Sequence, residues 1–431
     1  MKRRDWLLGV GGAAAAGLAG GAGDPPAEGP TGAAGHRCSA DFEPASALWL
    51  SFDHGHENLT AGLVAALRGH VPLRFVVRDA ASEAAARALL AARGLGDVAR
   101  DFVHEPLTTF FLRDLAVFTR GPGGEPGVVD LRWSQYGVAQ WCSRRHADRG
   151  IAQRCAADAD RSREGFDVAF ARRIGARLHR SALALEGGAF ETNGRGVVLA
   201  NAELLASRNP GVERAALQRM LLALPGIRKV VWLPGGLAED PLLRATITGD
   251  YVAWGAGGHT DEFVRFADPR TVLLAWPDDA DAAAHPVRRL TRQRMERNLA
   301  VLQRERDTDG RAFTVLKVPM PGIVQRRVFL SAVPDDERSR QWSAEHFPPQ
   351  EGRRQGQPLM EVAVASYLNF VVANGVVVLP DFVPHGTRAD RQQRVQRLFE
   401  RAFPGRGIRF VDAISAHWVG GGPHCATLNQ P

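Results

Sequence analysis

Short apolar runs alternate with longer amphipathic runs along the chain from Ala40 onward. The short runs are rich in β-branched residues and have the length of buried strands, whereas the longer runs space their apolar residues as amphipathic helices do. A strand, a helix and another strand recur in this order about five times, although no sequence repeat is visible. The alternation predicts a mixed α/β fold built from several small units.

The same alternation locates the individual elements. We expect strands over residues 48–52, 73–77, 115–119, 197–200, 230–233, 263–266, 272–276, 315–318, 376–379 and 408–411. We expect helices over residues 57–68, 82–93, 212–224, 287–303 and 388–403. Two polar stretches, residues 138–163 and 333–357, interrupt this pattern and are predicted to be surface insertions in one domain over residues 40–431.

The composition limits the classes of partner. Hydrophobic residues make up 45% of the 431 residues, which is enough for a sizeable core. The formal net charge of +7 comes almost wholly from arginine, because only three of the 54 basic residues are lysines. These arginines are scattered through segments that also contain acids, and aromatic residues are not interleaved with them. Specific nucleic-acid binding is therefore not expected, and the oligomeric state is left open.

The first residues have the pattern of an export signal. Met1-Lys2-Arg3-Arg4 is basic, Trp6-Leu7-Leu8 is apolar, and a Gly/Ala-rich run follows up to residue 23. The paired arginines indicate a twin-arginine-type signal over residues 1–23, followed by a flexible linker over residues 24–39. We therefore expect a periplasmic or extracellular protein. The apolar run is short and rich in glycine, so a stable membrane anchor is not expected.

The chain has four cysteines. In an oxidising compartment Cys142 and Cys155 could close a loop across the first insertion, and both the disulfide and the free thiols are compatible with the sequence. Cys38 would then be an unpaired thiol near the expected linker, with no assigned role.

Cys425 follows three consecutive glycines, residues 420–422, close to the end of the chain. Such a turn lets the backbone approach a ligand closely, so the thiol is a candidate nucleophile. An isolated cysteine can equally be a small buried hydrophobic residue. A metal site made of His259, Asp261, His424 and Cys425 is not favoured, because these residues do not have a zinc-binding spacing.

A base and several carboxylates could serve this nucleophile. His259 and Asp261 follow a Gly-Gly pair, and on an extended strand both side chains would project from the same face. Asp114 and the weaker candidate Glu186 supply further carboxylates, which suit the NH groups of a planar guanidinium cation. The alternative is structural: a satisfied polar histidine, and an ion pair with Arg113 or a turn cap for Asp114.

Several segments resemble the agmatine deiminase and bacterial peptidylarginine deiminase family, in the family's order and from about residue 40 to the end of the chain. They are Phe110-Phe111-Leu112-Arg113-Asp114, Leu185-Glu186-Gly187-Gly188, residues 231–237, Gly257-Gly258-His259-Thr260-Asp261-Glu262, residues 365–375 and residues 416–431. The resemblance implies the pentein fold, a pseudo-fivefold αβ-propeller with a central active site. Periodicity alone would also fit a conventional α/β sheet.

The resemblance also implies a reaction. Members of the family convert a guanidino group to a ureido group and release ammonia through a covalent cysteine thiouronium intermediate, without a metal or another cofactor. Carried onto this sequence, Cys425 is the nucleophile, His259 the general acid and base, and Asp261 and Asp114 the carboxylates that hold the substrate. Further substrate-binding candidates are Glu186, Phe111 and Asn369.

The predicted pocket departs from the family's pattern, and these departures leave more than one substrate open. Phe111 replaces the usual tryptophan, and Thr260 stands where an aliphatic residue is usual. The leading substrate is agmatine, as in putrescine biosynthesis. The export signal favours the alternative, a peptidylarginine deiminase that acts on protein arginine. A non-catalytic guanidine-binding protein is a third possibility.

Overall fold

The computed structural model describes residues 35–98, 101–146, 148–157, 163–332 and 341–431. The expected export signal, residues 1–23, lies outside these ranges. Within them, no helix is both long enough and apolar enough to span a lipid bilayer.

In the part of the chain that the structure describes, one arrangement of three strands occurs five times. The first strand pairs antiparallel with the second, and the second pairs parallel with the third. The helices of each unit lie in the connection between the two parallel strands. Parallel neighbours need such a crossover, so the recurring strand, helix and strand of the sequence are these units.

Three units come from the first half of the chain and the C-terminus. One contains β21 (Thr427–Gln430), β2 (Ala47–Ser51), α1 (Glu57–Leu67) and β3 (Leu73–Val77), extended by α2 (Ala80–Ala92) and β4 (Asp101–His104). The next contains β5 (Val117–Arg120), β6 (Pro126–Arg132), α3 (Val138–Arg145), α4 (Arg149–Ala157), α5 (Phe166–Ile174) and β7 (Arg177–Ala184). The third contains β8 (Glu191–Thr192), β9 (Val197–Asn201), α6 (Ala202–Arg208), α7 (Arg214–Leu222) and β10 (Lys229–Leu233).

The second half of the chain supplies the other two units and a further sheet. One unit contains β13 (Val264–Phe266), β14 (Thr271–Trp276), α9 (Asp279–Ala284), α10 (Pro286–Arg304) and β15 (Thr314–Pro319). The other contains β18 (Val371–Ala373), β19 (Val376–Pro380), α11 (Ala389–Ala402) and β20 (Gly407–Val411). The further sheet has the order β11 (Leu242–Thr248), β12 (Tyr251–Ala256), β17 (Pro358–Val362) and β16 (Gln325–Phe329).

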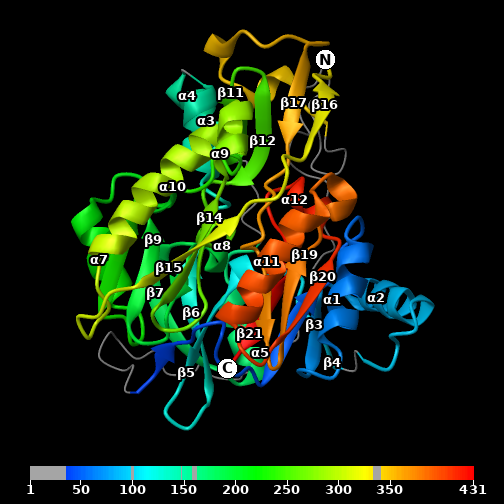
Figure 1. Cartoon of the computed structure of the whole chain (residues 1–431), viewed down its shortest axis with the longest axis vertical. Coiled ribbons are helices and arrows are strands. Elements are labelled where there is room, and N and C mark those ends of the chain that lie inside the picture. The colour runs from blue at the N-terminus through cyan, green and yellow to red at the C-terminus, as the bar shows by residue number, and fades with distance from the viewer. Residues whose placement is uncertain (1–34, 99–100, 147, 158–162, 333–340) are drawn as a thin grey trace.

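Figure 1 shows the strands of the units in the middle of the molecule, with α1, α10 and α11 on the outside. The sheet of β11, β12, β16 and β17 projects from one end, with α3 and α4 beside it. The two ends of the described chain meet in one sheet, because β21 pairs with β2. This pairing brings the C-terminal segment, which carries Cys425, back to the first unit.

Each expected strand and helix is present, with ends that move by no more than two residues. All five residues of β19 are buried, as expected for an apolar strand with neighbours on both sides. The fold begins before the predicted boundary at residue 40, because β1 (Arg37–Cys38) pairs with β5 and Cys38 is buried. The expected linker therefore does not extend to residue 39.

The described part of the first insertion, residues 138–146, 148–157 and 163, contains two helices. Its helices α3 and α4 are joined by a disulfide between Cys142 and Cys155, whose Cα atoms lie 5.8 Å apart. The described part of the second insertion contains two short 3-10 turns, Ala344–His346 and Pro349–Glu351, and residues 333–340 lie outside the description.

Candidate active site

Cys425 lies between the glycine turn and β21. The turn approaches its neighbours as closely as the sequence suggested: a Cβ atom on Gly422 would lie 2.6 Å from Asn369 Oδ1. The backbone amide of Cys425 donates to Asn369 Oδ1 at 3.3 Å, and its carbonyl accepts from the amide of Arg113 at 3.0 Å. These contacts fix the cysteine backbone against two other segments of the chain.

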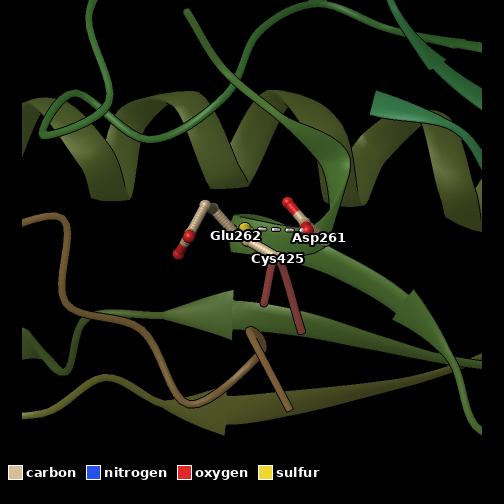
Figure 2. A group of neighbouring side chains, drawn as sticks. All are labelled: Asp261, Glu262 and Cys425. Carbon is tan, nitrogen blue, oxygen red and sulfur yellow. Dashed lines mark hydrogen bonds between the residues drawn. The ribbon is translucent and has the colours of Figure 1, made fainter. Parts of the chain in front are cut away.

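The Cys425 thiol is surrounded by polar groups although it is only 1% exposed. It donates to Asp261 Oδ2 at 3.3 Å and accepts from Asn369 Nδ2 at 3.0 Å. The same amide of Asn369 donates to Glu262 Oε1 at 2.6 Å. Figure 2 shows Cys425 between Asp261 and Glu262. The sulfur therefore faces two carboxyl groups, as a nucleophile for a cation would.

His259 stands at the start of a short helix, α8 (Thr260–Phe263), and not on the extended strand that the sequence suggested. Gly257 and Gly258 have φ angles of +91° and +92°, a left-handed conformation that turns the chain out of β12 and into the helix. Asp240 Oδ2 accepts from the amides of Gly258 at 2.8 Å and His259 at 2.9 Å. This turn, and not strand geometry, places His259 and Asp261 in one pocket.

The His259 imidazole lies among three carboxyl groups. Its Nε2 is 3.3 Å from Glu186 Oε2. Its Nδ1 is 3.6 Å from Asp114 Oδ1 and 3.9 Å from Asp261 Oδ1. Burial opposes the charged form, but the charges of Asp114, Glu186 and Asp261 outweigh it and raise the pKa of His259 to about 9. The ring is therefore an imidazolium at neutral pH.

Asp114 lies in a 3-10 turn, Leu112–Leu115, that replaces the beginning of the strand expected over residues 115–119. Its Oδ1 accepts from the amide of Gly188 at 3.1 Å, and its Oδ2 accepts from the hydroxyl of Tyr136 at 2.8 Å. Burial and the nearby charges of Asp261 and Glu186 raise the pKa of Asp114 to about 6. It is ionised at neutral pH and can bind a cation.

Glu186 contacts the imidazole but is already paired. Arg208 Nε donates to both of its oxygens at 2.9 Å, and Ser134 Oγ donates to Oε1 at 3.1 Å. Burial raises the pKa of Glu186, but Arg208 and His259 outweigh it and lower this pKa to about 2. The structure thus places Glu186 beside the general acid/base candidate, with less capacity to bind substrate than the sequence suggested.

The ligand-free Cys425 is a thiol and not a thiolate. Burial, followed by the negative charges of Asp261 and Asp114, raises the pKa of Cys425 well above its usual range. Burial and the charge of Asp261 also raise the pKa of Glu262 well above its usual range. A cation that enters the site would offset these negative charges and lower the pKa of the Cys425 thiol.

The remaining predicted residues line the same site. Phe111 lies against the glycine turn, because a Cβ atom on Gly421 would be 2.5 Å from its Cε1. Asn369 contacts Cys425 and Glu262 as described above. It lies two residues before β18.

Four further residues of the site were not identified as functional candidates from the sequence: Asp41, Ser134, Tyr136 and Arg208. His424 appeared there only in the disfavoured metal site, yet its Nδ1 lies 2.7 Å from Asp261 Oδ2. Its position next to Cys425 is the one signal that pointed to it. Tyr136 and Ser134 lie just before the first insertion, which carried no functional signal.

Three buried polar atoms of the site have no hydrogen-bond partner among the described residues. They are His259 Nδ1, Asp261 Oδ1 and Glu262 Oε2. Buried polar atoms are nearly always satisfied in folded proteins, so these three atoms are available to a ligand. The NH groups of a guanidinium would satisfy the two carboxyl oxygens.

The same region raises the question of a metal. Within the described ranges, ligand atoms of Asp261, Glu262 and Cys425 lie within 4.8 Å of one another (Figure 2). A thiolate with two carboxyl oxygens combines soft and hard ligands and lacks the imidazole that transition metals favour. This donor set therefore suits an organic cation better.

The comparisons with known proteins agree with the resemblance. The family model described as "Porphyromonas-type peptidyl-arginine deiminase" matches residues 37–431. The chain belongs to this family. The match covers nearly all of the described residues, so every site residue named above lies within it.

Relatives in the family are named as agmatine deiminases. The agmatine deiminase of Pseudomonas fluorescens is 30% identical over 57% of this chain and 57% of its own length. A protein of Selenomonas ruminantium named "Putative agmatine deiminase" is 32% identical over the same shares of the two chains. The chain thus matches little more than half the length of these two relatives. A Streptomyces avermitilis protein of the same name is 29% identical over 92% of this chain and 97% of its own.

Solved structures of the family share the fold. The agmatine deiminase of Enterococcus faecalis superposes with a TM-score of 0.67 at 20% identity, over 92% of this chain and 96% of that chain. The C. jejuni agmatine deiminase superposes with a TM-score of 0.59 at 16% identity, over the same shares. The mixed α/β fold that the sequence predicted is therefore confirmed.

Proposed function

We propose that this protein is a deiminase that hydrolyses the guanidino group of a small cationic substrate to a ureido group and ammonia. The observation that carries the proposal is the thiol of Cys425 beside unsatisfied oxygens of Asp261 and Glu262. These oxygens match the NH donors of one planar cation. Agmatine is the leading substrate, because the relatives are named for it.

The substrate cation would activate the nucleophile. Asp114 and Asp261 bind the guanidinium, whose positive charge offsets the carboxylates that keep the Cys425 thiol protonated. The thiol already donates to Asp261 Oδ2, so this carboxylate can accept its proton. The sulfur then attacks the guanidinium carbon and forms a tetrahedral adduct.

His259 would serve both halves of the reaction. As an imidazolium it donates a proton to the departing nitrogen, so the C–N bond breaks and ammonia leaves a thiouronium on Cys425. The neutral imidazole then removes a proton from a water molecule that attacks the same carbon. The C–S bond breaks, the sulfur regains a proton, and the product is a ureido compound.

A substrate panel tests this function. The purified protein is incubated with agmatine, free arginine and an arginine-containing peptide, and ammonia and ureido product are measured. We expect turnover of agmatine, and mass spectrometry of the acid-quenched enzyme should detect an adduct on the Cys425 peptide. Cys425→Ser should abolish turnover, while Cys38→Ser, the matched change at the other free cysteine, should retain it. Turnover by Cys425→Ser would remove this residue from the mechanism.

Protein arginine is the second candidate substrate. The description of the family model names a peptidyl-arginine deiminase, which supports this candidate.

We also propose export through the twin-arginine-type signal, because the disulfide between Cys142 and Cys155 is typical of exported proteins. Fractionation of cells that express the full chain, with Arg3→Lys and Arg4→Lys as the control, tests it. Equal amounts of the wild-type protein and of the Arg3→Lys, Arg4→Lys variant outside the cytoplasm would contradict export by this route.

We further infer that the five repeated units form the pentein propeller. The support is their common strand order, with an antiparallel pair followed by a parallel pair in each described unit. The residues proposed for catalysis come from between these units: Asp114 precedes β5, Glu186 precedes β8, Asp261 precedes β13, and Cys425 precedes β21. Equivalent positions in different units would converge on a central axis in such a propeller.

A further inference from the structure

The segment 133–137, which links β6 to α3, contacts two of the carboxyl groups around His259. The Tyr136 hydroxyl donates to Asp114 Oδ2 at 2.8 Å. The Ser134 hydroxyl donates to Glu186 Oε1 at 3.1 Å. The Tyr136 ring also lies 5.9 Å from the His259 ring, between centroids. One short segment therefore touches the group that binds the cation and the group that holds the imidazole.

Tyr136 covers the Asp114 side of the site. Its own residue surface is partly exposed, whereas Asp114 is 5% exposed and His259 only 1% exposed. The tyrosine thus has its hydroxyl in the site while part of the residue reaches solvent, so it lies between the buried Asp114 and the surface.

The segment adopts an unfavourable conformation. Gln135 and Tyr136 have φ angles of +51° and +55°, which non-glycine residues rarely adopt. Such residues persist only where their surroundings compensate, and they concentrate at ligand-binding and switching segments. Two buried donors of the segment, Trp133 Nε1 and Gln135 Nε2, also find no acceptor in the described ranges. The hydrogen bonds to the carboxylates offset these unfavourable terms.

The segment is held at both ends by contacts with other elements. Gly137 packs against the buried Arg208 so closely that a Cβ atom would lie 2.9 Å from its Nη1. On α3, Trp141 Nε1 donates to the carbonyl of Arg244 at 3.0 Å, and the disulfide ties Cys142 to α4. The segment itself contains no strand or helix, so its displacement would not break a sheet.

We propose that Tyr136 is a specificity-determining residue that restricts the site to free, small guanidino compounds and excludes arginine within a polypeptide. The proposal rests on the deiminase function and names its substrate class. A small cation can be enclosed once the segment has moved aside and returned. A polypeptide bears main chain on both sides of the arginine, so it would hold the segment 133–137 away from Asp114. The hydrogen bonds from Tyr136 to Asp114 and from Ser134 to Glu186 could then not form.

Two variants separate the ring from its hydroxyl. Tyr136→Ala removes the cover, and we expect the ratio of kcat/KM for an arginine-containing peptide to kcat/KM for agmatine to rise at least tenfold. Tyr136→Phe keeps the ring, and we expect lower agmatine turnover with an unchanged ratio. Tyr251→Ala is the matched control, because this half-buried tyrosine packs on His285 and on the apolar cluster of Ala238, Val287 and Val362. It should leave the ratio unchanged.

A second readout does not depend on turnover. Iodoacetamide alkylates accessible thiols, and peptide mapping distinguishes Cys425 from Cys38. We expect Tyr136→Ala to accelerate alkylation of Cys425 severalfold over wild type and over Tyr136→Phe, with Tyr251→Ala unchanged. Circular dichroism confirms that each variant is folded.

The outcomes distinguish this proposal from the deiminase function. Absence of turnover with every substrate, together with faster alkylation of Cys425 in Tyr136→Ala, would reject the deiminase function. It would still support the proposal that Tyr136 covers the site. Equal behaviour of Tyr136→Ala and Tyr251→Ala in both assays would contradict the proposal that Tyr136 covers the site. Wild-type turnover of the peptide as efficient as that of agmatine would overturn the selectivity.

Discussion

His424 Nδ1 lies 2.7 Å from Asp261 Oδ2, the oxygen that also accepts from the Cys425 thiol. The other nitrogen of the ring lies 2.5 Å from Asp41 Oδ2. Asp41 in turn binds Arg265 Nη2 at 2.7 Å. A chain of charged and polar groups thus holds Asp261 in one orientation, although none of the others contacts the sulfur.

We expect His424 to position Asp261. An asparagine amide can replace Nδ1 of histidine, whereas a glutamine amide replaces Nε2. His424→Asn should therefore keep the contact with Asp261 and retain more activity than His424→Gln, which should lower kcat on the order of 100-fold. Agmatine kinetics and thermal melting of both variants provide the measurement. Equal kcat values at equal melting temperatures would contradict a positioning role.

The pH profile should have two limbs. Below about pH 6 Asp114 becomes protonated and no longer attracts the cation, and above about pH 9 His259 loses its proton. We expect kcat/KM for agmatine to fall on both sides of this range. The Tyr136 hydroxyl lowers the pKa of Asp114, so Tyr136→Phe should move the acid limb to higher pH. An acid limb that stays at the same pH in Tyr136→Phe would show that a group other than Asp114 controls it.

Gly188 leaves no room for a side chain. A Cβ atom there would lie 2.7 Å from both Asp114 Oδ1 and His259 Nδ1. We expect Gly188→Ala to fold but to displace these groups and lower kcat/KM on the order of 100-fold. In the control Gly96→Ala the nearest atom is 3.5 Å from the new Cβ, so activity should be retained. Full activity of Gly188→Ala would show that the geometry here tolerates displacement.

Arg208 should be essential for stability. Its pair with Glu186 is fully buried, with 0% exposure of both side chains. Arg208→Met leaves the buried Glu186 carboxylate with His259 and Ser134 alone, and we expect the free energy of unfolding to fall by about 3–5 kcal/mol. Denaturant unfolding measures this change, and Arg68→Met, at an exposed pair with Asp97, should have little effect. Adding Glu186→Gln to Arg208→Met should restore part of the loss, because it removes the buried negative charge.

Much of the fold followed from local sequence. The apolar periods of β19 and α10 reflect burial of one strand and of one helix face, and such periods are visible in the residues themselves. The errors occurred where local rules competed. Gly257 and Gly258 lead into α8 where an extended conformation was expected for His259 and Asp261, and the Leu112–Leu115 turn precedes β5, which begins two residues later than expected.

The sequence alone also predicted Cys425, His259 and Asp261 as candidate site residues, because each follows glycines that mark a close backbone approach, and the structure brings the three together. Only the tertiary structure decided what surrounds them. The partners of these residues come from distant segments: Tyr136 is 22 residues from Asp114, Glu186 is 73 residues from His259, and Asp41 is 383 residues from His424. Periodicity tells which side of an element is buried, but the contact across two elements is set by how the units pack, and no local pattern encodes that.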